Sequence, residues 1–197
     1  MLFRSILLAA NTDGSGGQEV VADFGATGLW QYQNSAWVPL SGDNIELMIT
    51  GDFNADGIEE LYLDLGAGGL FRYNNGSVAQ LSTANAENML AGDTDGAAGD
   101  EIIADFGAGG LSLWKSGAWT LLSSSNASGL AGAELDGDGL VQVAANFPSL
   151  GVFRWKSGTG WTQMTGTQAE ALGAADTDGD GLEELVADFG AIGLWLW

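Results

Sequence analysis

The chain has 197 residues and a formal net charge of −21, which comes from 26 acidic and 5 basic side chains. Because nucleic acids and anionic membranes are bound through clustered Lys and Arg, this charge argues against both as partners. The sequence contains no Cys and no His, which excludes disulfides, thiolate or imidazole metal sites and His-based catalytic triads.

The first ten residues, MLFRSILLAA, do not predict a secretory signal peptide. Their apolar run is short and merges into the first of the repeats described below. No later stretch reaches the length of a transmembrane helix. Because 46% of the residues are hydrophobic and eight are Trp, the chain is expected to fold around a core rather than to be disordered.

One acidic segment recurs five times along the chain. The copies begin at Asn11, Asp52, Asp93, Glu134 and Asp176, so the period is 41, 41, 41 and 42 residues. Repetition at such a period is typical of proteins built from one supersecondary unit. We number the positions of each repeat from these five residues, which are position 1, and call the acidic segments loops one to five.

A short apolar run followed by two small residues precedes each loop, and we predict that it forms the innermost strand of the repeat. Five strands can crowd around one axis only if their side chains are small. The predicted inner strands are Ile6–Ala9, Leu47–Ile49, Met89–Ala91, Leu130–Ala131 and Ala171–Gly173.

A second strand is predicted after each loop, because the runs there are short and rich in β-branched residues. These runs are Glu19–Asp23, Leu61–Leu63, Glu101–Ala104, Val143–Ala145 and Leu185–Ala187. A tight turn follows each second strand. Its pattern is D-[FL]-G-A-x-G in the first, second, third and fifth repeats, and the fourth repeat has Asn146–Gly151 in its place. The Asp that opens the turn is expected to accept hydrogen bonds from nearby backbone amides; the alternative is a ring of carboxylates around a ligand pocket.

Two further strands complete each repeat, the third with large side chains and the fourth weaker. The third strands are Leu29–Tyr32, Leu70–Tyr73, Leu111–Trp114, Val152–Trp155 and Leu194–Trp197. The fourth strands are Trp37–Leu40, Val78–Leu81, Trp119–Leu122 and Trp161–Met164. Pro39 fits an outer edge strand, where a missing N–H donor does no harm.

The Trp residues form two groups with different expected roles. One group should pack between repeats and consists of Trp30, Trp114, Trp155, Trp195 and Trp197. The other lies near the predicted outer edge and consists of Trp37, Trp119 and Trp161. A partly exposed Trp there can stack on a sugar ring, so these three are the candidate ligand-binding residues.

Four antiparallel strands in about 41 residues is the size of one β-propeller blade. The sequence therefore predicts an all-β, five-bladed β-propeller that spans residues 1–197 as a single domain. The last repeat stops at Trp197, after its third strand. Residues 1–10 are expected to supply the first inner strand and, through Met1–Arg4, the missing outer strand that closes the ring.

Loops two and five match D-x-[DN]-x-D-G-x-x-E without a defect, through Asp52, Asn54, Asp56 and Glu60, and through Asp176, Asp178, Asp180 and Glu184. Oxygen ligands at every second residue, followed by a Gly, are what Ca²⁺ requires. We expect ligands from the side chains at positions 1, 3, 5 and 9 and from the carbonyl of position 7, Ile58 or Leu182. An EF-hand is excluded, because it needs a bidentate Glu at position 12 and flanking helices.

The other loops carry fewer acids and are expected to bind Ca²⁺ more weakly. Position 5 of loop three is Ala97, and position 9 of loop four is Gln142. The candidate ligands are Glu134, Asp136, Asp138 and the Leu140 carbonyl in loop four; Asp93, Asp95 and Glu101 in loop three; and Asn11, Asp13, Ser15 and Glu19 in loop one. The alternative is that these side chains only make Asx turns in polar hairpins.

The pattern D-x-[DN]-x-D-G-x-x-[DE], followed directly by an apolar strand, resembles the FG-GAP (VCBS-like) repeats of integrin α-chain-type propellers. The resemblance implies that each loop joins the first two strands of a blade and binds Ca²⁺. It covers the whole chain, although integrin-type propellers usually have seven blades. Five-bladed lectins of the tachylectin type are similar in blade number and Trp content, but share no sequence motif with the chain.

The leading functional hypothesis is a non-enzymatic, monomeric, Ca²⁺-stabilised scaffold or recognition module with a protein or glycan partner. The alternative is a lectin with repeated sites between blades, where several weak sites would give avidity. A glycosidase is disfavoured, because its two carboxylates need different environments and the repeats are alike. An extracellular or periplasmic location is favoured, since weak calcium sites fill there.

Overall fold

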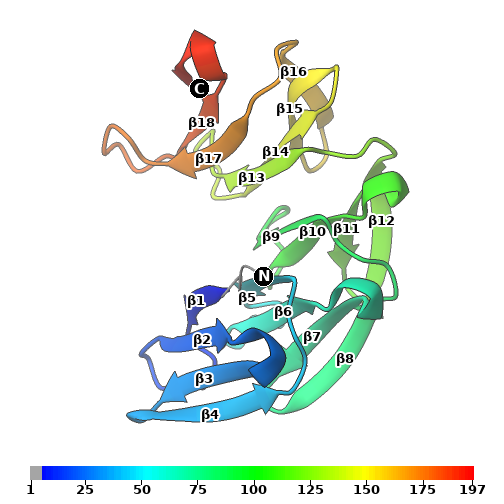
Figure 1. Ribbon diagram of the computed structural model, residues 1–197. Coiled ribbons are helices and arrows are strands. Elements are labelled where there is room, and N and C mark those ends of the chain that lie inside the picture. The colour runs from blue at the N-terminus through cyan, green and yellow to red at the C-terminus, as the bar shows by residue number, and fades with distance from the viewer. Residues whose placement is uncertain (1–5) are drawn as a thin grey trace. The chain divides into compact units, whose positions relative to one another are not determined.

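The computed structural model describes residues 6–197, which form strands, turns and four short 3₁₀ segments, without an α-helix (Figure 1). None of the helical segments in this range could cross a membrane. The chain divides into two compact units, Met1–Met89 and Leu90–Trp197, and each is described by itself.

The first unit contains two four-stranded antiparallel sheets whose strands lie side by side in chain order. One sheet consists of β1 (Leu7–Ala10), β2 (Glu19–Asp23), β3 (Leu29–Gln33) and β4 (Ala36–Ser41). The other consists of β5 (Leu47–Gly51), β6 (Glu60–Asp64), β7 (Leu70–Asn74) and β8 (Ser77–Ser82). Their shared core includes Val21, Leu29, Ile45, Leu61 and Leu63.

The second unit contains three sheets. Two have four strands: β9 (Asn88–Gly92), which begins just before the division, β10 (Glu101–Asp105), β11 (Leu111–Lys115) and β12 (Ala118–Ser123); and β13 (Gly129–Ala133), β14 (Gln142–Phe147), β15 (Gly151–Lys156) and β16 (Gly160–Thr165). The third has β17 (Ala171–Ala175), β18 (Glu184–Asp188) and β19 (Leu194–Leu196). Two hydrophobic clusters, around Val143 and Leu185, fill this unit.

The predicted order of strands within a repeat is confirmed in all five sheets. Pro39 lies on β4, at the edge of its sheet, as predicted. The fifth sheet has three described strands, and the predicted outer strand Met1–Arg4 lies outside the described residues. The single domain and the closed ring therefore remain predictions.

The turn after each second strand is a 3₁₀ segment in four sheets, where the sequence predicted only a tight hairpin. The segments are η1 (Gly25–Thr27), η2 (Gly66–Gly68), η3 (Gly107–Gly109) and η4 (Gly190–Ile192). Gly110 shows why the turn ends in a Gly. Its φ is 80°, and an added Cβ would lie 2.2 Å from the carbonyl oxygen of Ser123. No side chain fits between these two backbones.

The Asp that opens the turn accepts hydrogen bonds from backbone N–H groups, as the sequence predicted. Asp105 accepts hydrogen bonds from the N–H of Gly107 at 3.0 Å and from that of Ala127, before the next sheet, at 2.8 Å. Asp64 accepts from Ala86 at 3.3 Å in the same way. Asp23, Asp64 and Asp105 have no exposed surface, and Asp188 is half-buried. With three of the four buried, they cannot form a ring of carboxylates open to a ligand.

Burying the carboxylate of the Asp that opens the turn has an electrostatic cost. It raises the pKa of Asp64 to about 6, with the nearby Glu46 adding to the shift and the N–H donors of Ala86 and Gly66 opposing it. Burial likewise raises the pKa of Asp23. In the fourth repeat Asn146 takes the same place without charge. Its Oδ1 accepts from Ala169 N–H at 3.2 Å and its Nδ2 donates to Ala169 O at 2.8 Å.

Candidate metal centres

Each acidic loop joins the first and second strands of its sheet, as the sequence predicted. Position 9 is the first residue of the second strand in every sheet, so the strand itself presents this side chain to the loop. The five residues are Glu19, Glu60, Glu101, Gln142 and Glu184. Four of them are buried and Glu184 is half-buried.

Position 9 anchors the loop through one of its oxygens. That oxygen accepts the backbone N–H of position 2 in every sheet, at 2.9 Å for Glu19, 3.0 Å for Glu60, 2.9 Å for Glu101, 3.0 Å for Gln142 and 2.7 Å for Glu184. Where position 2 is Thr, its hydroxyl donates to the same oxygen. Position 9 therefore has a structural role in addition to the predicted metal-binding role.

Loop five gathers three carboxylates with a geometry that suits a hard cation. One oxygen from each of Asp176, Asp178 and Glu184 lies within 4.8 Å of the others. Ca²⁺ binds oxygens at 2.3–2.6 Å, so two of its ligands are at most about 5 Å apart. The residues present thus fit Ca²⁺. Asp180 is outside this group, and its Oδ1 accepts the N–H of Leu182 at 2.9 Å.

The Asx turns considered as an alternative are also present in loop five. Asp176 accepts from Gly179 N–H at 2.6 Å and from Gly181 N–H at 3.1 Å, and Asp178 accepts from Asp180 N–H at 3.1 Å. These bonds tie the acidic side chains to the backbone of their own loop. Because a carboxylate has about four acceptor sites, such a turn leaves room for a cation on the same group.

Loop two is built around Glu60, which is 2% exposed, but among the described residues no three of its acids offer oxygens within 4.8 Å of one another. Asn54 Nδ2 and Asn74 Nδ2 donate to Glu60 Oε1 at 2.8 and 2.7 Å. Asp52 accepts the N–H groups of Asp56 and Gly57 at 3.1 and 2.8 Å. Burial raises the pKa of Glu60, the N–H of Phe53 and the charge of Arg72 oppose the shift, and the charges of Asp56 and Asp52 add to it. A bound cation would relieve the part of this cost that remains.

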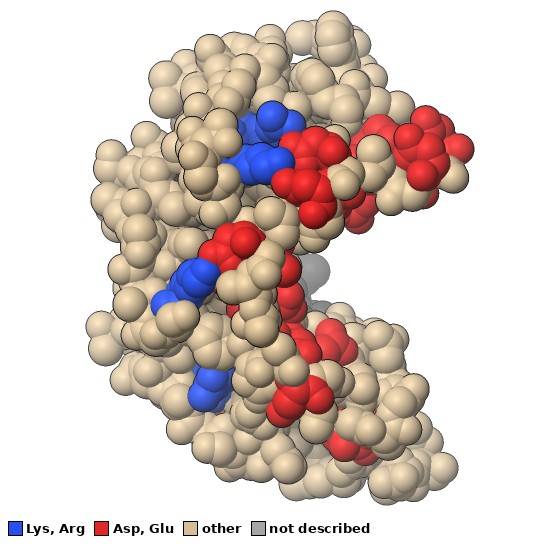
Figure 2. Space-filling view, turned by 180° about the vertical axis from the view of Figure 1, so that it is seen from behind, with Lys and Arg blue, Asp and Glu red and all other residues tan. Residues whose placement is uncertain are grey.

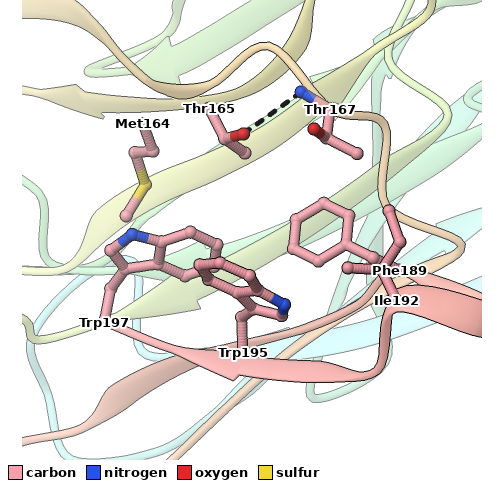
Figure 3. Close-up of a pocket in the computed structure, with 7 residues that line it drawn as sticks. All are labelled: Met164, Thr165, Thr167, Phe189, Ile192, Trp195 and Trp197. Atoms are coloured by element: carbon pink, nitrogen blue, oxygen red, sulfur yellow. Dashed lines mark hydrogen bonds between the residues drawn. The ribbon is translucent and has the colours of Figure 1, made fainter.

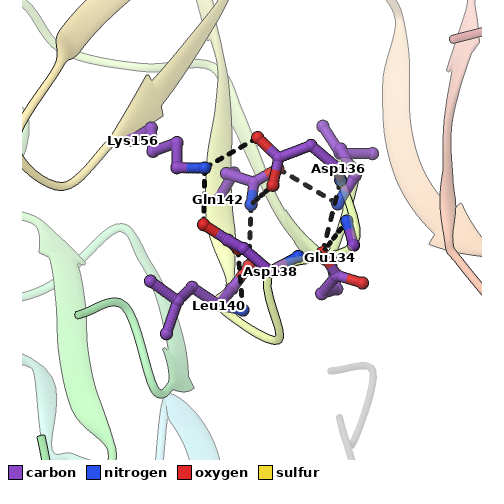
Figure 4. Close-up of polar contacts among 8 residues, drawn as sticks. Glu134, Asp136, Asp138, Leu140, Gln142 and Lys156 are labelled. Atoms are coloured by element: carbon purple, nitrogen blue, oxygen red, sulfur yellow. Dashed lines mark hydrogen bonds and ion pairs between the residues drawn. The ribbon is translucent and has the colours of Figure 1, made fainter. Parts of the chain in front are cut away.

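Loop four has three acids within 4.8 Å of one another, Glu134, Asp136 and Asp138, but a Lys is already among them (Figure 4). Lys156 Nζ lies 2.8 Å from Asp136 Oδ2 and 2.6 Å from Asp138 Oδ2. This contact lowers the pKa of Asp138 and raises that of Lys156. Gln142 Nε2 donates to Leu140 O at 2.8 Å and to Asp136 Oδ1 at 3.1 Å, so the expected carbonyl ligand already has a donor.

Loop three resembles loop four. Asp93, Asp95 and Glu101 each offer an oxygen within 4.8 Å of the others. Lys115 Nζ forms an ion pair with Asp95 and lies 3.9 Å from Glu101 Oε1. On the face of the molecule drawn in Figure 2, some of the basic side chains likewise lie directly beside clusters of acidic ones.

Loop one brings together the fewest charges. Asn11 Oδ1 accepts Gly14 N–H at 3.0 Å, and Asp13 Oδ1 accepts Ser15 N–H at 2.8 Å. Hydrogen bonds from Ser15 lower the pKa of Asp13, which is fully exposed. No group of three acidic ligands is found in this loop among the described residues, and its weaker binding stays a prediction.

Neighbouring loops within a unit are bonded to one another, which the sequence did not predict. In the first unit, Asn11 N donates to Glu59 Oε2 at 2.6 Å and Glu59 N donates to Asn11 O at 2.8 Å. In the second unit, Glu134 and Glu183 form the same two bonds, both at 3.0 Å. Position 8 of one loop thus holds position 1 of the loop before it.

The three Trp residues proposed to stack on sugars lie on edge strands β4, β12 and β16, as predicted. Each packs edge-on against the Phe of the preceding turn, with ring centroids 5.2 Å apart for Trp37 and Phe24, 5.0 Å for Trp119 and Phe106, and 5.2 Å for Trp161 and Phe147. Trp161 Nε1 also donates to Leu122 O at 2.9 Å. Trp37 is the most exposed, at 43%.

Trp195 and Trp197 differ from the expectation that they pack inside the fold. They are 52% and 37% exposed, because no described strand covers β19. Their rings stack at an interplanar angle of 29° with centroids 6.3 Å apart. They line a pocket of about 180 Å³ together with Met164, Thr165, Thr167, Phe189 and Ile192 (Figure 3).

Comparison with known proteins shows the fold but no family. No family model matches the chain, and no curated protein matches it in sequence. A structure of an Agrocybe aegerita lectin that recognises non-reducing terminal N-acetylglucosamine matches with a TM-score of 0.68 and 14% identity, over 99% of this chain and 66% of that chain. A structure of BBS1N in complex with ARL6DN matches with a TM-score of 0.64 and 13% identity, over 92% and 59%.

A third match is the GH74 xyloglucanase of Xanthomonas campestris, with a TM-score of 0.59 and 17% identity, over 90% of this chain and 28% of that chain. The chain spans less than two thirds of the length of each of these three proteins. At such identities the likeness shows a propeller-like all-β fold and nothing finer.

Proposed function

We propose that the chain is a calcium-binding β-propeller of FG-GAP-like repeats, in which the five sheets are blades and the protein acts as a non-enzymatic scaffold or recognition module. The observation that carries the proposal is loop five. Its three carboxylates converge within 4.8 Å, and among the described residues no Lys or Arg pairs with them. Loop two supports it through its complete motif and its buried Glu60, although its acids are more widely spaced than those of loop five.

Calcium here would act on stability. The acids repel one another in the metal-free protein, and a cation that binds only the folded form stabilises it by mass action. We expect that excess EGTA lowers the melting temperature of the protein and that added Ca²⁺ restores it. The same melting temperature under both conditions would contradict the proposal.

A matched pair of variants assigns this effect to loop five. Asp178→Asn and Asp13→Asn each remove one charge from position 3, in loop five and in loop one. Asp178→Asn is expected to weaken calcium binding at least about tenfold, since it removes one of three clustered carboxylates, and Asp13→Asn should change it little. Isothermal titration measures both, and the reverse order would contradict the assignment.

The lectin alternative is favoured by one specific observation, the exposed Trp195–Trp197 stack beside the hydroxyls of Thr165 and Thr167. Aromatic faces with nearby hydroxyls suit a sugar ring. A glycan array, with Trp195→Ala as control, tests it. Binding that survives in EGTA and is lost in the variant would support this alternative, and no binding to any glycan would exclude it.

A further inference from the structure

We propose that Lys115 and Lys156 are built-in cations that occupy loops three and four in place of a metal ion, so that the residue ending the third strand decides which loops of this protein can bind calcium. The inference rests on the proposed function, because it explains which of the acidic loops perform it. It concerns the only two lysines in the chain.

The two lysines occupy the same place in their repeats. Lys115 is the last residue of β11 and Lys156 the last of β15, one period of 41 residues apart. Each side chain leaves its own strand and enters the loop of the same sheet, where it reaches two predicted ligand positions. Lys156 bridges Asp136 and Asp138, and Lys115 pairs with Asp95 and approaches Glu101.

The loops that hold a Lys are also those in which a ligand is missing. Loop three has Ala97 at position 5, and loop four has Gln142 at position 9. In loop four the Gln142 amide donates to Asp136 and to the Leu140 carbonyl. Asp136, Asp138 and the carbonyl thus already accept bonds from donors of the chain itself. A metal ion would have to displace a tethered ammonium and would then be repelled by it at close range.

The equivalent residues of the first two repeats are neutral amides, Gln33 and Asn74. Asn74 donates to Glu60 Oε1 at 2.7 Å and places no charge in loop two. The described part of the fifth repeat ends at Trp197, before this position. Among residues 6–197, no Lys or Arg forms an ion pair with an acid of loop five. The two loops with complete motifs are thus not among those that hold a Lys, although the charge of Arg72 acts on Glu60 in loop two without an ion pair between them.

An exposed ion pair would ordinarily contribute little to stability, so the experiment measures metal binding instead. The variants exchange residues that the repeats themselves use at this position. Lys156→Asn copies the second repeat into the fourth, and Asn74→Lys does the reverse. Arg154→Gln removes a positive charge two residues earlier on the same strand and is the control. Circular dichroism verifies that each variant is folded.

Isothermal titration with CaCl₂ at fixed ionic strength, on protein freed of metal by a chelator, gives the number of sites and their affinities. We expect Lys156→Asn to gain one site, or to bind at loop four at least about tenfold more tightly. Asp136→Asn in the same background should remove the gain. Asn74→Lys should lose one wild-type site, and Arg154→Gln should match the wild type.

The outcomes separate this inference from the function on which it rests. If the wild type binds calcium but Lys156→Asn gains nothing and Asn74→Lys loses nothing, the inference is overturned and the calcium proposal stands. If neither the wild type nor any variant binds calcium, both are overturned.

Discussion

At the scale of single residues, the side chain at position 9 of each loop and the Asp that ends the second strand stabilise different segments. The residue at position 9 fastens the start of each loop to its second strand, through a backbone N–H at 2.7–3.0 Å. The Asp that ends the second strand fastens the turn and the segment that leads to the next sheet. Neither role depends on a metal, so both can be tested in its absence.

Glu60→Ala and Asp56→Ala should separate anchoring from metal binding. Glu60 accepts bonds from Phe53, Asn54 and Asn74. Its removal leaves partly buried donors without a partner, so it should lower the free energy of unfolding by about 1–3 kcal/mol even in EGTA. Asp56→Ala should destabilise chiefly when calcium is present. Urea denaturation with and without EGTA measures both, and equal effects of Glu60→Ala and Asp56→Ala in EGTA would refute the anchoring role.

Asp64→Asn should stabilise the protein near pH 7. The pKa of Asp64 is about 6 in the folded protein and 3.8 as its ordinary value. The folded state therefore binds more protons than the unfolded state between these values, and the free energy of unfolding falls as pH rises through that window. The loss is at most about 3 kcal/mol, since one pKa unit is about 1.4 kcal/mol.

The Asp64→Asn variant does not lose stability in this pH window, because an amide does not titrate. Asn146 shows that an amide at the equivalent position of the fourth repeat forms two hydrogen bonds with the backbone. The measurement is chemical denaturation of wild type and Asp64→Asn from pH 4 to pH 8. The stability difference should grow in favour of the variant as pH rises to about 7. A difference that does not change with pH would show that Asp64 does not titrate in this range.

At the scale of elements, close backbone packing decides the turn after the second strand. Gly110 and Gly117 have similar dihedral angles, with φ of 80° and 88°, but an added Cβ meets Ser123 O at 2.2 Å only at Gly110. Gly117→Ala should cost about 1 kcal/mol, the usual cost of a left-handed Ala. Gly110→Ala should cost at least about 2 kcal/mol more. Thermal melting compares them, and equal losses would mean that the contact is not tight.

The strands were predictable because each repeat contains its own pattern. Five copies at one period identify the order of strands and place the loops between the first and second of them. The 3₁₀ form of the turn was not predictable from its glycines, since the approach of Ser123 to Gly110 is a contact between segments. The exposure of Trp195 and Trp197 was missed because their strand pattern matches that of the buried Trp155.

The lysines were missed for a similar reason, although a signal was present. Lys115 and Lys156 lie 41 residues apart, in line with Gln33 and Asn74, but the motif that identifies the loops does not extend to the third strand. Only the fold brings the end of that strand to the loop. A comparison of all repeat positions by charge would have found it.

At the scale of the whole molecule, a charge of −21 on 197 residues produces self-repulsion that cations beside the acids reduce. The chain supplies two of its own in loops three and four, and the proposal assigns calcium to loops two and five. This division explains why complete and incomplete acidic motifs can persist side by side in one protein. It also limits how many metal ions a single chain should carry.

A crystal structure grown in millimolar CaCl₂, with anomalous scattering used to identify calcium, tests calcium binding most directly. We expect an ion in loop five between Asp176, Asp178 and Glu184, another in loop two beside Glu60, and the Lys156 ammonium still between Asp136 and Asp138. Loops two and five without calcium under those conditions would contradict the proposed function.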